Sequence, residues 1–330
     1  MKEILNNFTA KLQKILMKLI ESRENPAASS LLIIIGLFLV GFLFFGSVIQ
    51  IIVLMAAGIS FQDIATNGGD FSKMPNAWLG MIIGQGFGSF IGFIGTAWLY
   101  WKVIEKKSWQ DLNFKPLPSL QVFGMVVLIQ IAFMGFNGWL QELNQHFVFP
   151  EALRGLEAIL KSMEDKLAET TKFFTDFTSF WQFLLAFLVI AIIAGIGEEL
   201  IFRGLIMRKL FLLTNNIHVA IWVAGFIFAA IHFQFYGILP RMMLGVVFGY
   251  LYYWTGNIWV PIFAHIFNNG LAITVMYLHN IKIIKADLEN MDNVPISIVI
   301  FSLLATIGLM FLFKNYMQQK ELNSQHTEIL

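Results

Sequence analysis

The chain has 330 residues, of which 57% are hydrophobic and only 13% are charged, and its mean hydropathy is +0.70. A soluble domain carries roughly 25% charged residues, so this composition predicts a polytopic membrane protein and excludes a large soluble core. The net charge of +1 gives no information about partners, but the lack of a basic patch argues against a nucleic-acid partner. The absence of cysteine removes thiol catalysis, thiolate metal sites and disulfides.

Residues 1–28 predict an amphipathic helix on the cytoplasmic face of the membrane. Apolar side chains recur at helical spacing, and lysines mostly fall between them. The alternative is a helix packed on the protein's own helices. No compact apolar stretch precedes a small-residue cleavage site, so we expect this segment to be retained.

Apolar stretches of about 20 residues can cross a hydrocarbon core of about 30 Å, and their number predicts an all-α fold of about eight transmembrane helices. We expect spans at about 29–57, 76–103, 118–143, 179–203 or beyond, 217–235, 240–254, 258–279 and 294–314. The sixth span is short and rich in glycine. A charged, periodic segment at 150–176 predicts an amphipathic helix outside the membrane. Residues 317–330 are predicted to form a polar C-terminal tail.

Lysine and arginine are distributed unevenly between the two sides of this topology. With the N-terminus inside, 14 of the 22 basic residues fall on inner segments. This bias predicts that both termini are cytoplasmic.

Ionisable residues interrupt the apolar pattern in the fourth span. Glu198 and Glu199 closely follow the run 181–194, in which a glutamine is the only polar residue. Charges at such depth are costly and by default mark a functional site. Glu199 and Arg203 are four residues apart and can pair on one helical face, whereas Glu198 has no such partner. We expect one carboxylate to be held in place and the other to be free for chemistry; the alternative for the Glu199–Arg203 pair is a purely structural role.

Three further polar residues lie in the apolar second half of the chain, namely His232, His265 and Asn269. His265 and Asn269 are four apart and share one helical face. Glu198 and His232 are each 17 residues from Asn215, which lies in a predicted turn. The two side chains are then at the same level of an antiparallel hairpin, about 25 Å from that turn. These four polar groups are expected to converge on one buried pocket.

A carboxylate and a neutral imidazole can together take a proton from water, as peptide hydrolysis requires. We assign this role to Glu198 with His232, and stabilisation of the oxyanion to His265 with Asn269. Phe228, one turn before His232, is a candidate for shaping a substrate groove, with core packing as the alternative. A zinc ion held by Glu198, His232 and His265 stays open, because two histidines and a carboxylate are acceptable ligands. The His-Glu-x-x-His motif of zinc proteases does not occur.

At these residues the sequence resembles the CAAX protease and bacteriocin-processing family of intramembrane proteases, also called the Abi family. The family motifs Glu-Glu-x-x-x-Arg, Phe-x-x-x-His and His-x-x-x-Asn stand here at 198–203, 228–232 and 265–269. The resemblance covers about 180–275 and leaves 1–178 without a match.

The resemblance implies a metal-independent, glutamate-type endopeptidase with an eight-helix fold. We expect the catalytic core at 179–316, after the first three spans, which lie in 29–178. The resemblance supports the catalytic roles given above to the two histidines, to Glu198 and to Asn269. In it, Glu199 and Arg203 are supporting residues. The implied partners are the bilayer and a membrane-embedded or lipid-anchored peptide, in a bacterial inner membrane. In prenyl-processing relatives the pocket opens toward the cytosol, whereas the turn count places it nearer 237–240, on the side that the lysine pattern calls outer.

Two other classes of function remain open. One is a non-catalytic membrane scaffold or bacteriocin-immunity protein of the same fold, and the other is a transporter with an ion path. The small number of membrane charges and the lack of a visible repeat argue against transport.

Overall fold

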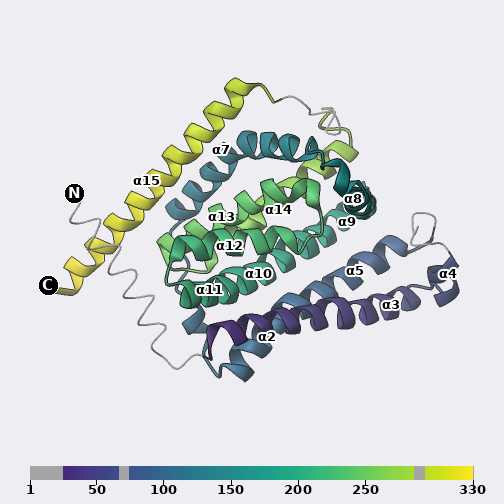
Figure 1. Cartoon of the computed structure of the whole chain (residues 1–330), viewed down its shortest axis with the longest axis horizontal. Helices are drawn as coiled ribbons and strands as arrows, with labels where there is room; N and C mark the ends of the chain where they lie inside the picture. Colours follow the sequence, from purple (N-terminus) through teal and green to yellow (C-terminus); the bar gives the residue numbers. More distant parts are fainter. Residues whose placement is uncertain (1–24, 67–73, 286–293, 330) are drawn as a thin grey trace.

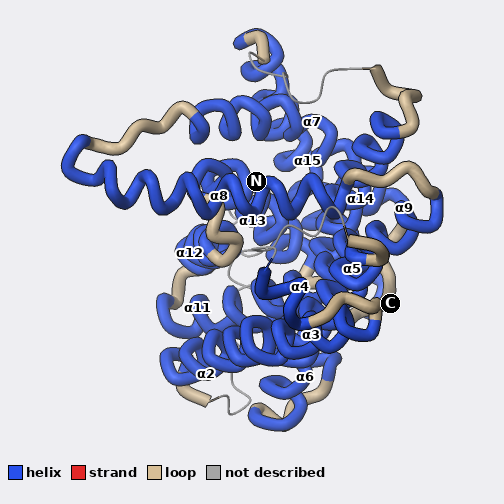
Figure 2. The backbone as a smooth tube through the Cα atoms, turned by 90° about the vertical axis from the view of Figure 1, so that its right-hand side faces the viewer, coloured by secondary structure: helices blue, strands red, loops and turns tan. Residues whose placement is uncertain are grey.

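The computed structural model describes residues 25–66, 74–285 and 294–329, and every regular element in this part of the chain is helical (Figures 1 and 2). The prediction of an all-α fold is therefore confirmed. The amphipathic helix expected in 1–28 lies almost wholly outside the described residues. Seven of the described helices are long and apolar enough to cross a membrane: Ala27–Ala56, Ala77–Ile104, Leu120–Gln145, Phe180–Thr214, Phe235–Thr255, Trp259–Asn280 and Ile296–Asn323.

The first two long helices form an antiparallel hairpin along the lower edge of Figure 1. Each is a continuous helix that alternates between α-helical and wider π-helical turns. The first consists of α2 (Ala27–Leu39), η1 (Val40–Phe45) and α3 (Gly46–Ala56). The second consists of α5 (Ala77–Ser89), η2 (Phe90–Gly95), α6 (Thr96–Trp98) and η3 (Leu99–Ile104), with the short α4 (Phe61–Thr66) between the two helices.

The remaining long helices enclose the polar residues. The helix that carries both carboxylates runs through α9 (Phe180–Ala186), η6 (Phe187–Ile193), α10 (Ala194–Glu199), η7 (Leu200–Ile206) and α11 (Met207–Thr214). Beside it lie α12 (Ile217–Ala230), α13 (Ile238–Thr255) and α14 (Trp259–Asn280), while α7 (Leu120–Gln145) packs against α13, α14 and α15 (Ile296–Ile329) (Figure 1). Helix α15 therefore continues to Ile329, through the described part of the segment 317–330 that was predicted to be a polar tail.

The turn between α11 and α12 was correctly predicted. Asn215 adopts a left-handed conformation with a φ of 51°, and the side chain of Asn216 accepts hydrogen bonds from two backbone N–H groups at the start of α12. A side-chain acceptor at this position satisfies N–H groups that have no partner within the helix. The sequence asparagine–asparagine therefore ends one helix and begins the next.

The fifth predicted span, 217–235, is wrong in length. Helix α12 has only 14 residues and ends at Ala230. Residues 231–234 form a turn, and the 3₁₀-helix η8 (Phe235–Gly237) leads directly into α13. Pro240, which was expected to mark the break, instead lies in the first turn of α13, where its missing N–H costs no hydrogen bond. His232 consequently lies in a turn and not within a helix.

The amphipathic helix expected at 150–176 is present as η5 (Glu151–Leu153) and α8 (Arg154–Thr175). Helix α8 packs against α5, α14 and η8. Oε2 of Glu164 accepts a hydrogen bond from the backbone N–H of Tyr236 at 2.9 Å, and Oε1 of Glu157 accepts one from the Tyr236 hydroxyl at 3.3 Å. Helix α8 therefore holds the segment that follows His232.

Helices α12 and α13 cross closely because two glycines meet at the crossing. A Cβ atom on Gly245 would come within 3.0 Å of the Cα of Gly225 and 3.2 Å of a ring carbon of Phe228. Small residues allow helix backbones to approach in this way. The crossing brings the backbone carbonyl of Gly245 to the centre of the bundle.

Candidate active site

A fully buried carboxylate, Glu199, is the centre of the polar site. Its Oε1 accepts a hydrogen bond from Nη1 of Arg203 at 2.5 Å and lies 2.7 Å from Nδ1 of His265. Nη2 of Arg203 donates to the backbone carbonyl of Gly245 at 2.8 Å. None of the three side chains is more than 3% exposed. Since desolvating charges is costly, a pair at this depth depends on such additional hydrogen bonds.

The second carboxylate, Glu198, is 7% exposed. Its Oε2 lies 3.8 Å from Nε2 of His265, which is within ion-pair range but too far for a hydrogen bond. This oxygen accepts no hydrogen bond from any described protein group. Oε2 of Glu199 also lacks a donor, but that side chain already has two partners on its other oxygen. Glu198 is therefore the carboxylate with acceptor capacity left for a water or a substrate.

The ring of Phe228 separates the two histidines. Its centroid lies 5.3 Å from that of His232 and 5.7 Å from that of His265, with both imidazoles edge-on to it. The guanidinium carbon of Arg203 lies 5.1 Å from the same centroid, a cation–π contact. Phe228 is only 3% exposed, so this ring packs within the core and fixes the spacing of its three polar neighbours. A contribution to a substrate groove stays a prediction.

His232 presents one nitrogen to the backbone and leaves the other available. Its Nδ1 lies 2.8 Å from the carbonyl oxygen of Phe228. A carbonyl only accepts, so this contact places a proton on Nδ1 and leaves Nε2 of the neutral ring as an acceptor. His232 interacts electrostatically with His265 and Arg241, but it forms no hydrogen bond or ion pair with Glu198. Glu198 and His232 therefore each interact with His265 but share no hydrogen bond or ion pair, and their joint role stays a prediction.

Asn269 lies one helical turn after His265 on α14, as its spacing predicted. Its Nδ2 donates to the backbone carbonyl of Ile190 at 3.0 Å, and its Oδ1 accepts from Nδ2 of Asn268 at 3.2 Å. Ile190 belongs to the π-helical turn η6, and such turns, in which hydrogen bonds span five residues, often occur at functional sites. The amide is thus bound to the helix that carries Glu198.

One charged residue near the site was missed by the sequence analysis. Nη2 of Arg241, on α13, donates to Oε1 of Gln234 at 2.5 Å, and its Nη1 is buried without a protein partner. Arg241 interacts electrostatically with Glu198 and with Glu164 of α8. It belongs to no motif, but an arginine inside a predicted span is itself a signal that a functional site lies nearby.

The structure thus gathers the predicted residues around His265 and Phe228, although not in the pairs first expected. Glu198 and Glu199 lie on either side of the His265 imidazole, Arg203 is paired with Glu199, and Asn269 is fastened to Ile190. Within the described residues no group of three or more histidine, cysteine, aspartate or glutamate side chains is arranged to hold a metal ion. The zinc site left open by the sequence therefore lacks an assembled ligand set in this part of the chain.

The site falls within a segment that matches a known family. Residues 180–271 match the family described as type II CAAX prenyl endopeptidase Rce1-like. Among curated relatives, YpbD of Bacillus subtilis (strain 168) is 34% identical over 80 residues, which are 23% of this chain and 38% of that protein. YdiL of the same organism, described as a candidate membrane peptidase, is 34% identical over 98 residues, 30% of this chain and 39% of its own.

A third relative carries a more specific description. The membrane-embedded CAAX protease MroQ of Staphylococcus aureus (strain USA300) is 33% identical over 102 residues, 29% of this chain and 41% of that protein. No solved structure matches the chain significantly. The matched part of the chain spans about two fifths of the length of these curated relatives.

The fold and the matches define a multi-pass helical membrane protein related to bacterial membrane peptidases. Over residues 180–271 the chain is similar to the Rce1-like family of CAAX endopeptidases.

Proposed function

We propose that this protein is an intramembrane endopeptidase that hydrolyses a peptide bond in a membrane-embedded or lipid-anchored protein. The observation that carries the proposal is the approach of Glu198 to His265. A buried carboxylate oxygen of Glu198 without a protein donor lies 3.8 Å from Nε2 of His265, and the other ring nitrogen, Nδ1, is bonded to Glu199. A positioned carboxylate and imidazole are the components of general acid–base catalysis. The match of residues 180–271 to a protease family supports the same conclusion, because members of such a family act on protein substrates.

In the proposed reaction Glu198 is the general base. It takes a proton from a water molecule whose oxygen attacks the carbonyl carbon of the substrate, while Nε2 of His232 is a second acceptor for that water. The carbonyl π electrons move onto the oxygen and form a tetrahedral oxyanion. When the C–N bond breaks, the proton held by Glu198 passes to the leaving nitrogen, and the products are a carboxylic acid and an amine.

The oxyanion is stabilised from α14. With a proton on each nitrogen, His265 donates from Nδ1 to Glu199 and from Nε2 to the oxyanion. The cluster of two carboxylates, one guanidinium and one imidazolium is then formally neutral, which limits the cost of burying it. The side-chain amide of Asn269 donates one hydrogen bond to the carbonyl of Ile190, and its second N–H can donate to the same oxyanion.

The substitution Glu198→Gln tests this proposal, because it removes the base and keeps the shape of the side chain. The full-length protein would be reconstituted in liposomes with two probes, a farnesylated peptide that ends in a CAAX sequence and an unprenylated peptide with a transmembrane anchor. We expect kcat to fall by about 10²–10⁴-fold for whichever probe the wild type cleaves. Glu151→Gln is the matched control, because the Glu151 side chain is 84% exposed on the helix η5.

Unchanged cleavage by a correctly folded Glu198→Gln variant would overturn the proposal. A wild-type protein that binds a probe and never cleaves it would instead support a non-catalytic scaffold or immunity protein of the same fold. Size-exclusion profiles and thermal unfolding of each variant separate a loss of chemistry from a loss of folding.

A further inference from the structure

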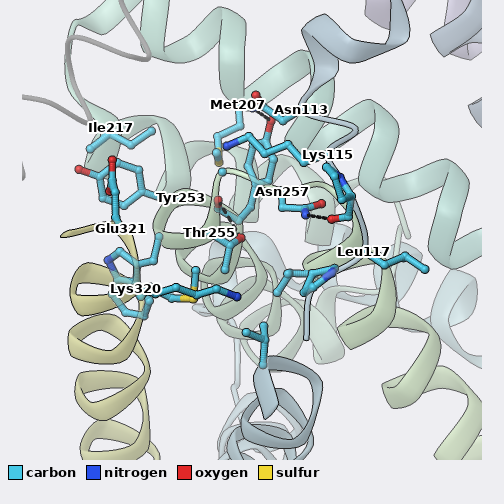
Figure 3. A pocket seen from close by; sticks show the side chains of 18 residues that line it. Asn113, Lys115, Leu117, Met207, Ile217, Tyr253, Thr255, Asn257, Lys320 and Glu321 are labelled. Atoms are coloured by element: carbon cyan, nitrogen blue, oxygen red, sulfur yellow. Dashed lines mark hydrogen bonds between the residues drawn. The ribbon is translucent and has the colours of Figure 1, made fainter. Parts of the chain in front are cut away.

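A cavity of about 490 Å³ is lined by side chains from several elements (Figure 3), and it lies beside the start of α12, at the opposite end of that helix from His232. Ile217, the first residue of α12, lines it, whereas His232 follows the last residue of that helix. The other lining residues come from the connection before α7, the start of α7, the start of α11, the end of α13, the start of α14 and the late turns of α15. The volume is typical of small-molecule sites. None of the side chains assigned to the proposed active site lines this cavity.

Two lysines reach this cavity from separate elements. Lys115 comes from the connection before α7 and Lys320 from α15 (Figure 3). Neither ammonium group forms a hydrogen bond or an ion pair with a described residue, although the carboxylate of Glu321 acts on Lys115 electrostatically. Desolvation lowers the pKa of Lys115 below its usual range, and Glu321 opposes that shift. A desolvated ammonium group without a close partner favours a bound anion.

The walls around Lys115 are held in place by hydrogen bonds. Nδ2 of Asn257 donates to the carbonyl of Pro116 at 2.8 Å, and Nδ2 of Asn113 donates to the hydroxyl of Tyr252 at 2.7 Å. Both asparagines are only 7% exposed. The cavity is therefore formed by fixed backbone and side-chain contacts before any ligand binds.

The turn at Gly256 leaves room for the ammonium group of Lys115 in the cavity. Gly256 has a φ of 51°, and a Cβ atom at this position would come within 3.1 Å of Nζ of Lys115. The bare backbone of the turn thus leaves room for the lysine to fold over it.

The rest of the lining is apolar and lies where the long helices end. Val122, Val260 and Met317 contribute apolar side chains from the ends of α7, α14 and α15. At the rim, Leu117 is 70% exposed, and the nearby Leu120 is 87% exposed. Exposed leucines beside a lysine at the ends of spanning helices are suited to the boundary between lipid headgroups and acyl chains.

We propose that this cavity binds an anionic phospholipid, with its phosphodiester group between Lys115 and Lys320 and its apolar part along α7 and α15. Two ammonium groups and one carboxylate, that of Glu321, give the cavity a formal charge of +1. This charge matches the single negative charge of a phosphodiester. Basic pockets between membrane helices bind lipid headgroups by the same electrostatics.

The experiment measures lipid binding to the purified full-length protein by native mass spectrometry. The probes are phosphatidylglycerol, zwitterionic phosphatidylcholine and inorganic phosphate. We expect one phosphatidylglycerol to be retained, and its affinity to fall roughly 5-fold for Lys115→Gln or Lys320→Gln and roughly 30-fold for the double variant. The double variant Lys102→Gln/Lys106→Gln is the matched control, because it removes the same charge from exposed lysines at the same end of the molecule.

Each arm supports or overturns the proposal. Equal retention of phosphatidylcholine would show that the lysines do not select the ligand and would overturn it. Binding of inorganic phosphate that excludes phosphatidylglycerol would assign the site to a soluble anion and would also overturn it. An equal loss of affinity in the control pair would show that general surface charge, and not the cavity, attracts the lipid.

Discussion

Nδ1 of His265 lies 2.7 Å from Oε1 of Glu199, although the two residues are 66 positions apart in the chain. This contact joins α14 to α10, and the same oxygen also accepts the guanidinium of Arg203. Glu199 is therefore more than the local helical partner of an arginine. It fixes the orientation of the imidazole whose other nitrogen approaches Glu198.

We predict that Glu199→Gln destabilises the protein by about 3–5 kcal/mol, because it leaves the buried guanidinium of Arg203 without its counter-charge. Denaturant unfolding in detergent measures the loss. Glu151→Gln, in an exposed pair with Arg154 at 3.5 Å, is the control and should leave unfolding unchanged. A Glu199→Gln variant as stable as the wild type would show that the bond from Arg203 to the carbonyl of Gly245 is sufficient.

Replacement of His265 and replacement of His232 should reduce the stability of the protein by different amounts. His265→Ala is expected to abolish cleavage and to lower the unfolding temperature, since the ring is 3% exposed and bonded to Glu199. His232→Ala should reduce kcat by about 10²-fold or more with a smaller change in stability, because His232 lies in a turn and bonds only to a backbone carbonyl. Parallel cleavage and thermal unfolding measurements separate the two effects. Equal losses of stability would contradict this distinction.

A glycine substitution tests the crossing of α12 and α13. Gly245→Ala places a Cβ within 3.0 Å of the backbone of Gly225 and 3.2 Å of the Phe228 ring, so it should destabilise the protein by about 1–3 kcal/mol and reduce cleavage. Gly124→Ala on α7 is the control. Nothing lies within 4 Å of the added atom there, and alanine should favour the helix. The prediction fails if both variants unfold at the wild-type temperature.

A second buried ion pair lies away from the proposed active site. Nζ of Lys209 is 2.7 Å from Oε1 of Glu105, both side chains are at most 1% exposed, and the hydroxyl of Tyr100 donates to the same oxygen at 2.6 Å. We expect Lys209→Met to cost about 3–5 kcal/mol of stability and to leave cleavage per folded molecule unchanged. Lys102→Met, at an exposed position, is the control. Adding Glu105→Gln to Lys209→Met should recover part of the loss, and no recovery would argue against direct coupling.

Chelators should leave cleavage unchanged. The described residues contain no group of three or more histidine, cysteine, aspartate or glutamate side chains suited to a metal ion, and the proposed reaction uses only Glu198, imidazole groups and the Asn269 amide. The measurement is the rate after prolonged dialysis against EDTA and 1,10-phenanthroline, compared with a sample to which zinc is then added. A rate that falls with chelation and returns with zinc would replace the proposed mechanism by a zinc-dependent one.

The helical fold and the composition of the site were predictable because their signals are local. Apolar runs define the spans, and the asparagine pair at 215–216 defines the turn that separates α11 from α12. Helical spacing correctly placed Arg203 beside Glu199 and Asn269 one turn after His265.

Contacts between helices were not predictable in this way. The bond between Glu199 and His265 depends on the relative position of α10 and α14 along their axes, which no spacing within one helix determines. The end of α12 was misplaced because the turn was expected near 237–240, whereas it lies at 231–234 and Pro240 fits the first turn of α13. Arg241 was missed because it belongs to no motif, although its place inside a predicted span is a signal; its interaction with Glu198 arises only in the folded chain.

The bonds from α8 to Tyr236 have a consequence for regulation. Two carboxylates of a polar surface helix, Glu157 and Glu164, hold a segment that begins only a few residues after His232. The sequence predicts that α8 lies outside the membrane, so the turn that carries His232 would be anchored partly from the aqueous phase, where salts, soluble proteins and acidity act directly. We therefore expect that an agent that displaces these two acids would loosen the attachment of the turn without entering the bilayer, and would make the proposed reaction sensitive to events outside the membrane.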